Sequence, residues 1–150
     1  MTEPLIKVAD LAWGRIKSPD LDVQEEFLTN FGMIKVERTN DKLFMRGTGA
    51  SHHIHVTEKG DPGFVSLAFR ADNEDDLHKL AAEAESASGV EEIDEPGGGK
   101  RVRLTEPNGY TIEIVHGIEA VDEIPVERQS YNLGNIDKYK RANELWRRAA

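Results

Sequence analysis

Hydrophobic and polar positions follow a pattern that runs along the chain twice. Each copy opens with an alternating segment rich in strand-forming residues, and alternation is the spacing of a half-buried strand. A segment with apolar residues three to four positions apart follows, which is the spacing of a helix. Three short alternating segments then close the copy. The pattern therefore predicts strand–helix–three strands, repeated once.

In the first copy, the opening strand is predicted over residues 11–18 and the helix directly after it. Ser18 is expected as the N-cap and Pro19 as the first helical residue, because proline has no N–H to leave unbonded there. Gly32 is expected to end the helix. Its predicted apolar positions are Leu21, Val23, Phe27, Leu28 and Phe31. The closing strands are predicted within residues 33–39, 42–48 and 52–58.

In the second copy, the opening strand is predicted over residues 64–71 and the helix over 72–89. Asp72 or Asn73 is expected to cap this helix and Gly89 to end it. The closing strands are predicted within residues 90–96, 100–106 and 110–117, with a loose glycine loop at 97–99 and a turn at 107–109.

These elements divide the chain into a first module at residues 1–60, a second at 61–120, and an extension at 121–150. The extension is predicted to run extended and then form a mainly basic helix from about Asp137. A solvated linker face is the simplest reading of that helix, and an acidic binding partner is the alternative.

Composition narrows the possible functions. The chain has 150 residues, a formal net charge of -9 and no cysteine. The acidic balance argues against nucleic acid as a partner, because phosphate binding needs a basic surface. Without thiolates, a metal would need His, Asp, Glu or Tyr ligands. No apolar run approaches the length of a membrane span, so a soluble cytoplasmic protein without a membrane partner is expected.

Three of the five histidines lie in the stretch "GASHHIHVTEKG". Superposing the last strands of the two copies sets residues 53–57 on residues 111–115, which makes His55 equivalent to Glu113. Alternation then places His53 and His55 on one face of their strand. The three side chains are candidates for a metal site, although histidines on a strand also occur as ordinary polar residues.

The repeated pattern also carries a family resemblance. "SPDLD…FG" follows the first strand, "SLAFRADNEDDL" opens the second copy and "EPNGYTIEIVHG" closes it. Together they resemble the vicinal oxygen chelate superfamily, which includes glyoxalases, bleomycin-resistance proteins and extradiol ring-cleaving dioxygenases. The resemblance covers roughly residues 5–118. It implies an α+β fold in which two paired βαβββ modules form a cupped mixed sheet, followed by a linker and a C-terminal helix.

The extension resembles the connector after the first domain of two-domain extradiol dioxygenases, whose second domain holds the iron. The resemblance therefore implies a second catalytic domain or subunit, or a homo-oligomer, as the partner. Fe(II) or Mn(II) is implied for the complete enzyme, and no cofactor is expected in this chain.

By the same resemblance, metal ligands come from the opening and closing strands and face the cup. Trp13 and Ser66 stand at the opening-strand positions, and neither is a usual ligand of a divalent metal. His55 and Glu113 stand at the closing-strand positions. His53 matches an acid–base histidine that lies beside the metal in the iron-bearing domain.

Three hypotheses follow. The first, which we favour, is a non-catalytic first domain of a ring-cleaving catechol dioxygenase. The second is a self-contained metalloenzyme that uses His53, His55 and Glu113. The third is a binding module for a small aromatic or drug-like ligand, with a cavity lined by Trp13, Ser66 and Phe69.

Some residues also have simpler interpretations. Trp13 is expected to be a core residue, because most tryptophans are largely buried. Glu113 is expected to pair with Arg103 across the strands if it does not face the cavity. The stretch 97–101, "GGGKR", is expected to form a mobile hairpin, because it lacks the strand–loop–helix order of a phosphate loop.

Overall fold

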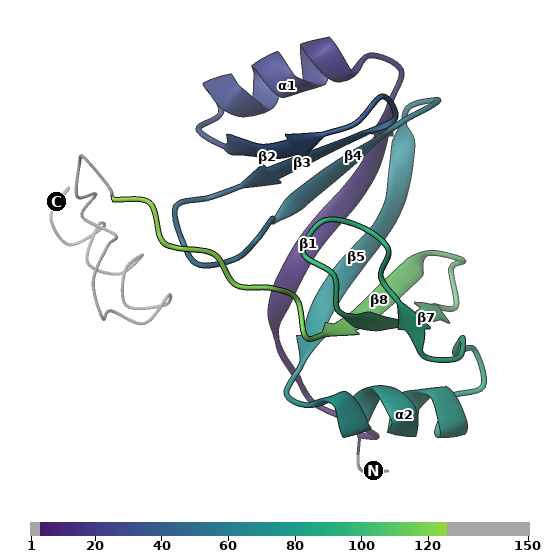
Figure 1. Ribbon diagram of the computed structural model, residues 1–150. Helices are drawn as coiled ribbons and strands as arrows, with labels where there is room; N and C mark the ends of the chain where they lie inside the picture. Colours follow the sequence, from purple (N-terminus) through teal and green to yellow (C-terminus); the bar gives the residue numbers. More distant parts are fainter. Residues whose placement is uncertain (1–3, 126–150) are drawn as a thin grey trace, which may run out of the picture.

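The computed structural model describes residues 4–125 and shows one eight-stranded mixed sheet with two helices (Figure 1). The first module contains β1 (Val8–Ser18), α1 (Leu21–Asn30), β2 (Ile34–Arg38), β3 (Lys42–Arg46) and β4 (His55–Lys59). The second contains β5 (Gly63–Ala71), α2 (Glu74–Glu83), β6 (Glu91–Glu92), β7 (Lys100–Thr105) and β8 (Thr111–His116). The α+β fold with two βαβββ modules is confirmed. The basic helix predicted from about Asp137 lies outside the described residues.

The two opening strands pair at the centre of the sheet, whose order is β2-β3-β4-β1-β5-β8-β7-β6. β1 runs antiparallel to β5. Each opening strand runs parallel to the last strand of its own module, β1 to β4 and β5 to β8. In Figure 1, α1 lies against the β2–β4 end and α2 against the end formed by β5, β8 and β7. Both helices cover the same face of the sheet, so the other face is left as the cup.

Alternation along the strands sorts apolar side chains between these two faces. The helix-covered face holds two clusters, one under each helix. The cluster under α1 contains Leu21, Leu28, Leu43 and Met45, and the cluster under α2 contains Ala71, Leu77, Leu80, Val102 and Ile114. The cup face holds a third cluster, formed by Ala12, Trp13, Phe44, Val56, Ala68, Ile93 and Val115. No helix within residues 4–125 is long and apolar enough to cross a membrane.

Helix α1 begins two residues later than predicted. Asp20, not Ser18, is the N-cap, because its carboxylate accepts hydrogen bonds from the N–H groups of Asp22 and Val23 at 2.8 and 3.1 Å. α2 is capped by Asn73, as expected, but it ends at Glu83 and not at Gly89. Ala84 takes an extended conformation and stops the helix there.

Only part of the apolar set predicted for α1 is buried. Leu21 and Leu28 face the sheet, whereas Val23, Phe27 and Phe31 are 63 %, 61 % and 74 % exposed. The latter three are four residues apart, so they form one stripe on a different side of the helix. We refer to Val23, Phe27 and Phe31 as the α1 stripe.

The strand predicted within residues 90–96 is present only as the two-residue β6, and the segment between β6 and β7 is a loop. Gly97, Gly98 and Gly99 all have positive φ angles there. Only glycine fits at position 99, because the Cβ of any other residue would lie 2.7 Å from the carbonyl oxygen of His116. The loop is thereby held close to the end of β8.

Candidate functional site

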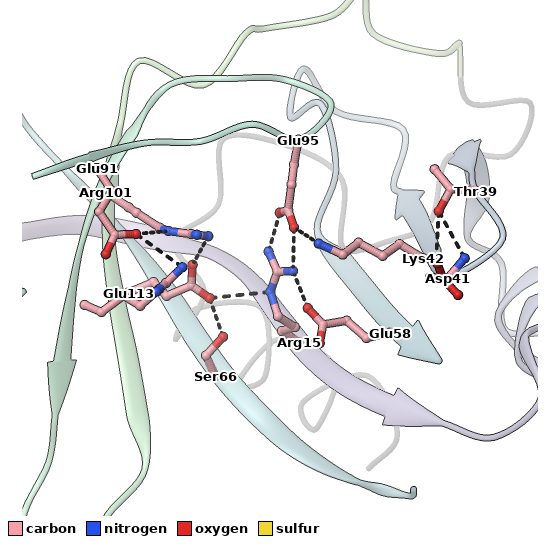
Figure 2. Close-up of polar contacts among 11 residues, drawn as sticks. Arg15, Thr39, Asp41, Lys42, Glu58, Ser66, Glu91, Glu95, Arg101 and Glu113 are labelled. Atoms are coloured by element: carbon pink, nitrogen blue, oxygen red, sulfur yellow. Dashed lines mark hydrogen bonds and ion pairs between the residues drawn. The ribbon is translucent and has the colours of Figure 1, made fainter. Parts of the chain in front are cut away.

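One half of the cup is polar and contains a cavity of about 310 Å³. Arg15, Ser66 and Glu113 lie in its wall, together with Glu58 and Glu95. Figure 2 shows these side chains converging from different segments of the chain. β1 supplies Arg15, and the β6–β7 loop supplies Glu95. Both modules therefore build this cavity.

Arg15 is the centre of the polar half and is only 3 % exposed. Its Nη1 donates to Glu58 Oε1 at 2.8 Å, and its Nη2 donates to Glu95 Oε2 at 2.6 Å. A second bond joins Nη1 to the other oxygen of Glu95 at 3.1 Å, so this pair is bidentate. Arg15 Nε lies 3.5 Å from Glu113 Oε1. One guanidinium thus faces three carboxylates.

Glu113 is buried on the cup side of β8, with 2 % of its surface exposed. The hydroxyl of Ser66 donates to one of its oxygens, and Arg101 Nη1 lies 3.2 Å from the other. The expected partner, Arg103, instead pairs with Glu91 at 3.2 Å. Glu113 therefore faces the cavity, and its burial is balanced by charged and hydrogen-bonding neighbours.

The ion pairs raise the pKa of Arg15 and lower the pKa of Glu95. Burial opposes ionisation of Glu95, but hydrogen bonds from Arg15 and Lys42 outweigh it and lower the pKa of Glu95 to about 2. Burial likewise opposes the charge of Arg15. Hydrogen bonding and attraction from Glu95, with Glu113 and Glu58, nevertheless raise the pKa of Arg15 above its ordinary value. Arg15 and Glu95 therefore stay ionised throughout the physiological pH range.

The other half of the cup is apolar and contains His53. The His53 ring lies 4.6 Å from the Trp13 ring and 5.4 Å from the Phe44 ring, measured between centroids. Its Nδ1 lies 3.1 Å from Nδ1 of His52. Burial, followed by the nearby His52 and Arg15, lowers the pKa of His53 to about 4. His53 is therefore neutral at neutral pH.

Two buried polar atoms in the apolar half have no hydrogen-bond partner within the described part of the chain. They are Nε1 of Trp13 and Nε2 of His53. Trp13 itself is only 1 % exposed, which confirms the expectation of a core residue.

His55 lies on the face opposite to Glu113. It pairs in register with Met45, whose side chain packs under α1, and its Nε2 lies 2.8 Å from the Thr57 hydroxyl. Burial lowers the pKa of His55. The expected equivalence of His55 and Glu113 is therefore not found.

The physical reason is a shift of one residue in the superposition of the closing strands. Val56 and Glu113 both stand four positions before the glycine that follows their strand, Gly60 or Gly117. Val56 packs in the cup cluster, so it is the cup-facing residue at this position. The chain is irregular before β4 begins, and the alternation expected to join His53 to His55 does not extend across that bend.

The remaining predicted residues are divided between the two faces. Ser66 and Glu113 line the cavity as expected. Phe69, expected to line it too, instead packs with the cluster under α2. Arg15, Glu58 and Glu95, which sequence reasoning missed, complete the polar half.

The residues at the implied metal positions do not fit a metal ion. Trp13 is packed in the core, Ser66 is bonded to Glu113, and His55 is on the wrong face. Across residues 4–125, no group of three or more His, Asp or Glu side chains is arranged to hold a metal ion. The positive charge beside Glu113 comes from arginine.

The fold and the sequence define the class of the protein. The family model described as "Glyoxalase/Bleomycin resistance protein/Dioxygenase superfamily" matches residues 13–114. The chain therefore belongs to this superfamily.

Two curated relatives, a metapyrocatechase and a dioxygenase, match most of the chain. The chain is 29 % identical over 131 residues to metapyrocatechase of Geobacillus stearothermophilus, covering 84 % of this chain and 40 % of the relative. It is 29 % identical over 126 residues to a manganese-dependent 2,3-dihydroxybiphenyl 1,2-dioxygenase of Geobacillus genomosp. 3, covering 79 % and 39 %. The chain thus spans about two fifths of the length of these relatives.

Solved structures share the fold. The Mn(II)-bound glyoxalase from Novosphingobium aromaticivorans matches with a TM-score of 0.75 and 21 % identity, covering 82 % of this chain and 44 % of that one. Homoprotocatechuate 2,3-dioxygenase from Brevibacterium fuscum matches with a TM-score of 0.72 and 20 % identity, covering 81 % and 40 %.

Proposed function

We propose that this chain is a non-catalytic module of an extradiol-type ring-cleaving dioxygenase, and that it works beside a second module that holds the metal. The observation that carries the proposal is the centre of the cup, where Arg15 forms ion pairs with three carboxylates. Among the four residues at the implied metal positions, Glu113 is the only one with a metal-ligating side chain that faces the cup. The partial coverage of two dioxygenase relatives supports it.

The role proposed for the chain is structural. It covers a flank of the metal-bearing module and supports contacts between subunits. Fe(II) or Mn(II) belongs to the other module, as does the chemistry on a catechol. In this assignment the ion pairs of the cup replace a catalytic centre by a rigid charged core.

The α1 stripe supports a contact role. Phe27 and Phe31 stack with their ring centroids 6.3 Å apart, and both are more than half exposed. Adjacent exposed aromatic side chains are a common feature of protein–protein contact surfaces. We assign the stripe to the contact with the partner module or subunit.

The two alternative functions have less support. A metal site made of His53, His55 and Glu113 requires side chains that lie in three separate places. An aromatic-ligand module requires an apolar cavity, whereas the cavity beside Ser66 is walled by ion pairs. Neither geometry is favoured by an observation in the described residues.

Activity and metal content test the catalytic half of the proposal. The purified chain is loaded with Fe(II) or Mn(II), and ring cleavage is measured on catechol, 2,3-dihydroxybiphenyl and 3,4-dihydroxyphenylacetate. We expect no stoichiometric metal by elemental analysis and no turnover. Turnover by the chain alone would overturn the proposal.

The partner is tested in the source cells. A tag placed on the native protein is used to recover it, and mass spectrometry identifies the polypeptides present. We expect a module with two histidines and a carboxylate at the metal positions, either in the same polypeptide or in the same complex. Recovery of the chain with no such module contradicts the proposal.

A further inference from the structure

The centre of the cup contains a cation that belongs to the protein itself. We propose that the Arg15 guanidinium is a built-in cation in the place of a metal ion, and that its removal creates a divalent-cation site from Glu58, Glu95 and Glu113. This rests on the proposed function only for the non-catalytic role of the native cup.

Three carboxylates converge on the Arg15 guanidinium. Three carboxylates from β4, β8 and the β6–β7 loop lie between 2.6 and 3.5 Å from nitrogen atoms of one side chain. Carboxylate oxygens are the ligands that Ca²⁺ and Mn²⁺ prefer. The carboxylates are spaced for a planar guanidinium, and this agrees with the lack of a preformed metal geometry in residues 4–125.

The hydrogen bonding of Arg15 is incomplete. Arg15 is only 3 % exposed, and its Nε makes no hydrogen bond within the described residues. That nitrogen faces Glu113 at ion-pair distance only. The guanidinium therefore provides charge to Glu113 without a matched bond, which is the role that a cation would have at this point.

The charges around the cavity balance only while Arg15 is present. Lys42 pairs with Glu95, and Arg101 pairs with Glu113 at 3.2 Å. Arg103, which also lines the cavity, is balanced by Glu91 at 3.2 Å. With Arg15 present, the three remaining positive groups face three carboxylates. A divalent ion entering the native cup would therefore meet no net negative charge and would have to displace a buried guanidinium. Without Arg15, the same group carries one net negative charge and has space for an ion.

The cavity has space for an ion once the guanidinium is removed. The cavity measures about 310 Å³ with the arginine present. Replacement by alanine adds the volume of the guanidinium to it. Water can then enter and complete the coordination of an ion, as it does for hard cations bound by few protein ligands.

The experiment compares Mn²⁺ binding by the native chain and by Arg15→Ala, with electron paramagnetic resonance used to count bound ions. We expect about one bound Mn²⁺ per Arg15→Ala chain. We also expect at least about tenfold weaker binding by the native chain, together with thermal stabilisation of the variant by Mn²⁺. Adding Glu113→Gln to Arg15→Ala should weaken this binding by about tenfold or more.

Arg38→Ala is the matched control. Arg38 also bridges two carboxylates, those of Asp22 and Glu25, at 2.5 and 2.8 Å, but on the surface. Its removal should create no Mn²⁺ site. Equal gains of binding in Arg15→Ala and Arg38→Ala would overturn the inference, because any loss of positive charge would then suffice.

The outcomes separate this inference from the proposed function. A folded Arg15→Ala variant that binds no Mn²⁺ overturns the inference and leaves the non-catalytic role intact. Ring cleavage by the native chain overturns the proposed function and leaves the role of Arg15 to be judged by binding.

A second measurement applies if Arg15→Ala does not fold in metal-free buffer. The variant is then refolded with millimolar Mn²⁺ or Ca²⁺, and circular dichroism reports the result. Recovery of the native spectrum supports the inference. Failure of both ions, with recovery by guanidinium ion alone, overturns it, because the site would then accept only the original group.

Discussion

The two halves of the cup differ in how their buried polar atoms are matched. In the polar half, the charges of Arg15, Glu95 and Glu113 have partners from several segments. In the apolar half, Trp13 Nε1 and His53 Nε2 are buried without a hydrogen-bond partner in the described residues. The same face of one sheet thus contains a region of paired charges, where Arg15 Nε lacks a hydrogen bond but lies 3.5 Å from Glu113, beside a neutral region whose unbonded polar atoms have no charged partner.

The difference shows what each half contributes. Matched charges fix geometry, because each carboxylate is acceptable in the interior only where its partner holds it. The neutral half is stabilised by buried area and packing, and it tolerates a few unpaired polar atoms at a cost. Removing a single group should therefore be most harmful in the polar half.

The largest effect is expected for Arg15→Met, which keeps a long apolar side chain and removes the charge. The buried Glu113 and the half-buried Glu58 and Glu95 would lose their shared partner, and breaking a buried pair costs about 3–5 kcal/mol. The free energy of unfolding from urea denaturation at pH 7 measures this loss.

Arg38→Met is its control. Arg38 pairs with Asp22 and Glu25 at the surface, where such pairs contribute about 0–1 kcal/mol. A similar loss in both variants would show that the polar half gains nothing from being buried.

The next effect is a pH dependence from the apolar half. The pKa of His53 is about 4 in the folded chain and 6.5 in the unfolded chain, so the unfolded chain takes up the proton first. The contribution of neutral His53 to the free energy of unfolding is therefore fully present above pH 6.5. It decreases by about 3 kcal/mol as the pH falls toward 4. Urea denaturation between pH 7 and 4 tests this, and His53→Gln should flatten the profile.

The polar half should respond at lower pH. The folded pKa of Glu95 is about 2, against an ordinary value of 4.5, so its contribution is present above pH 4.5 and decreases toward pH 2. Glu95→Gln should remove this lower window and leave the upper one. His78→Gln, on the exposed side of α2, serves as the control and should change neither window.

A smaller loss of stability is expected when one polar atom is removed from either half of the cup, and the two losses should differ. Ser66→Ala removes the hydroxyl that donates to Glu113, and hydrogen bonds to charged groups contribute about 1.5–3 kcal/mol. Trp13→Phe removes an N–H that has no acceptor, so its cost should be only that of the small cavity left in the core, about 1–2 kcal/mol. Thermal unfolding of both variants gives the order, and a larger loss for Trp13→Phe would contradict the contrast.

The smallest effect lies outside the cup and provides the baseline. Phe31→Gln changes an exposed residue of the α1 stripe, so the stability of the isolated chain should change by less than about 0.5 kcal/mol. Association with the partner module, measured by sedimentation, should weaken instead. A stability loss comparable to that of Ser66→Ala would show that the stripe packs within the chain.

The sequence predicted the fold well because the fold depends on local patterns. The duplicated strand–helix–strand order follows from alternation and from caps such as Asn73, which act over a few residues. The helix bounds were less accurate, since an aspartate at position 20 competed successfully with Ser18 as the cap.

The site was predicted less well because it depends on pairing between distant segments. Arg15 meets Glu95 from a loop 80 residues away, and no local pattern shows that contact. A charged residue in the apolar context of β1 was the available signal. The face of His55 was misassigned because strand alternation was extended across the irregular residues before β4.

The central position of β1 also affects how the chain folds. Gly14 pairs with His55 on one side and with Leu67 on the other. β1, the first strand of the described residues, therefore has both neighbours supplied by segments that are made later. Such nonlocal pairing slows folding to the millisecond-to-second range for domains of this kind. During synthesis, one edge of β1 stays unpaired until β4 has been made and the other until β5 has left the ribosome, so folding of the sheet is coupled to completion of the second module's first strand.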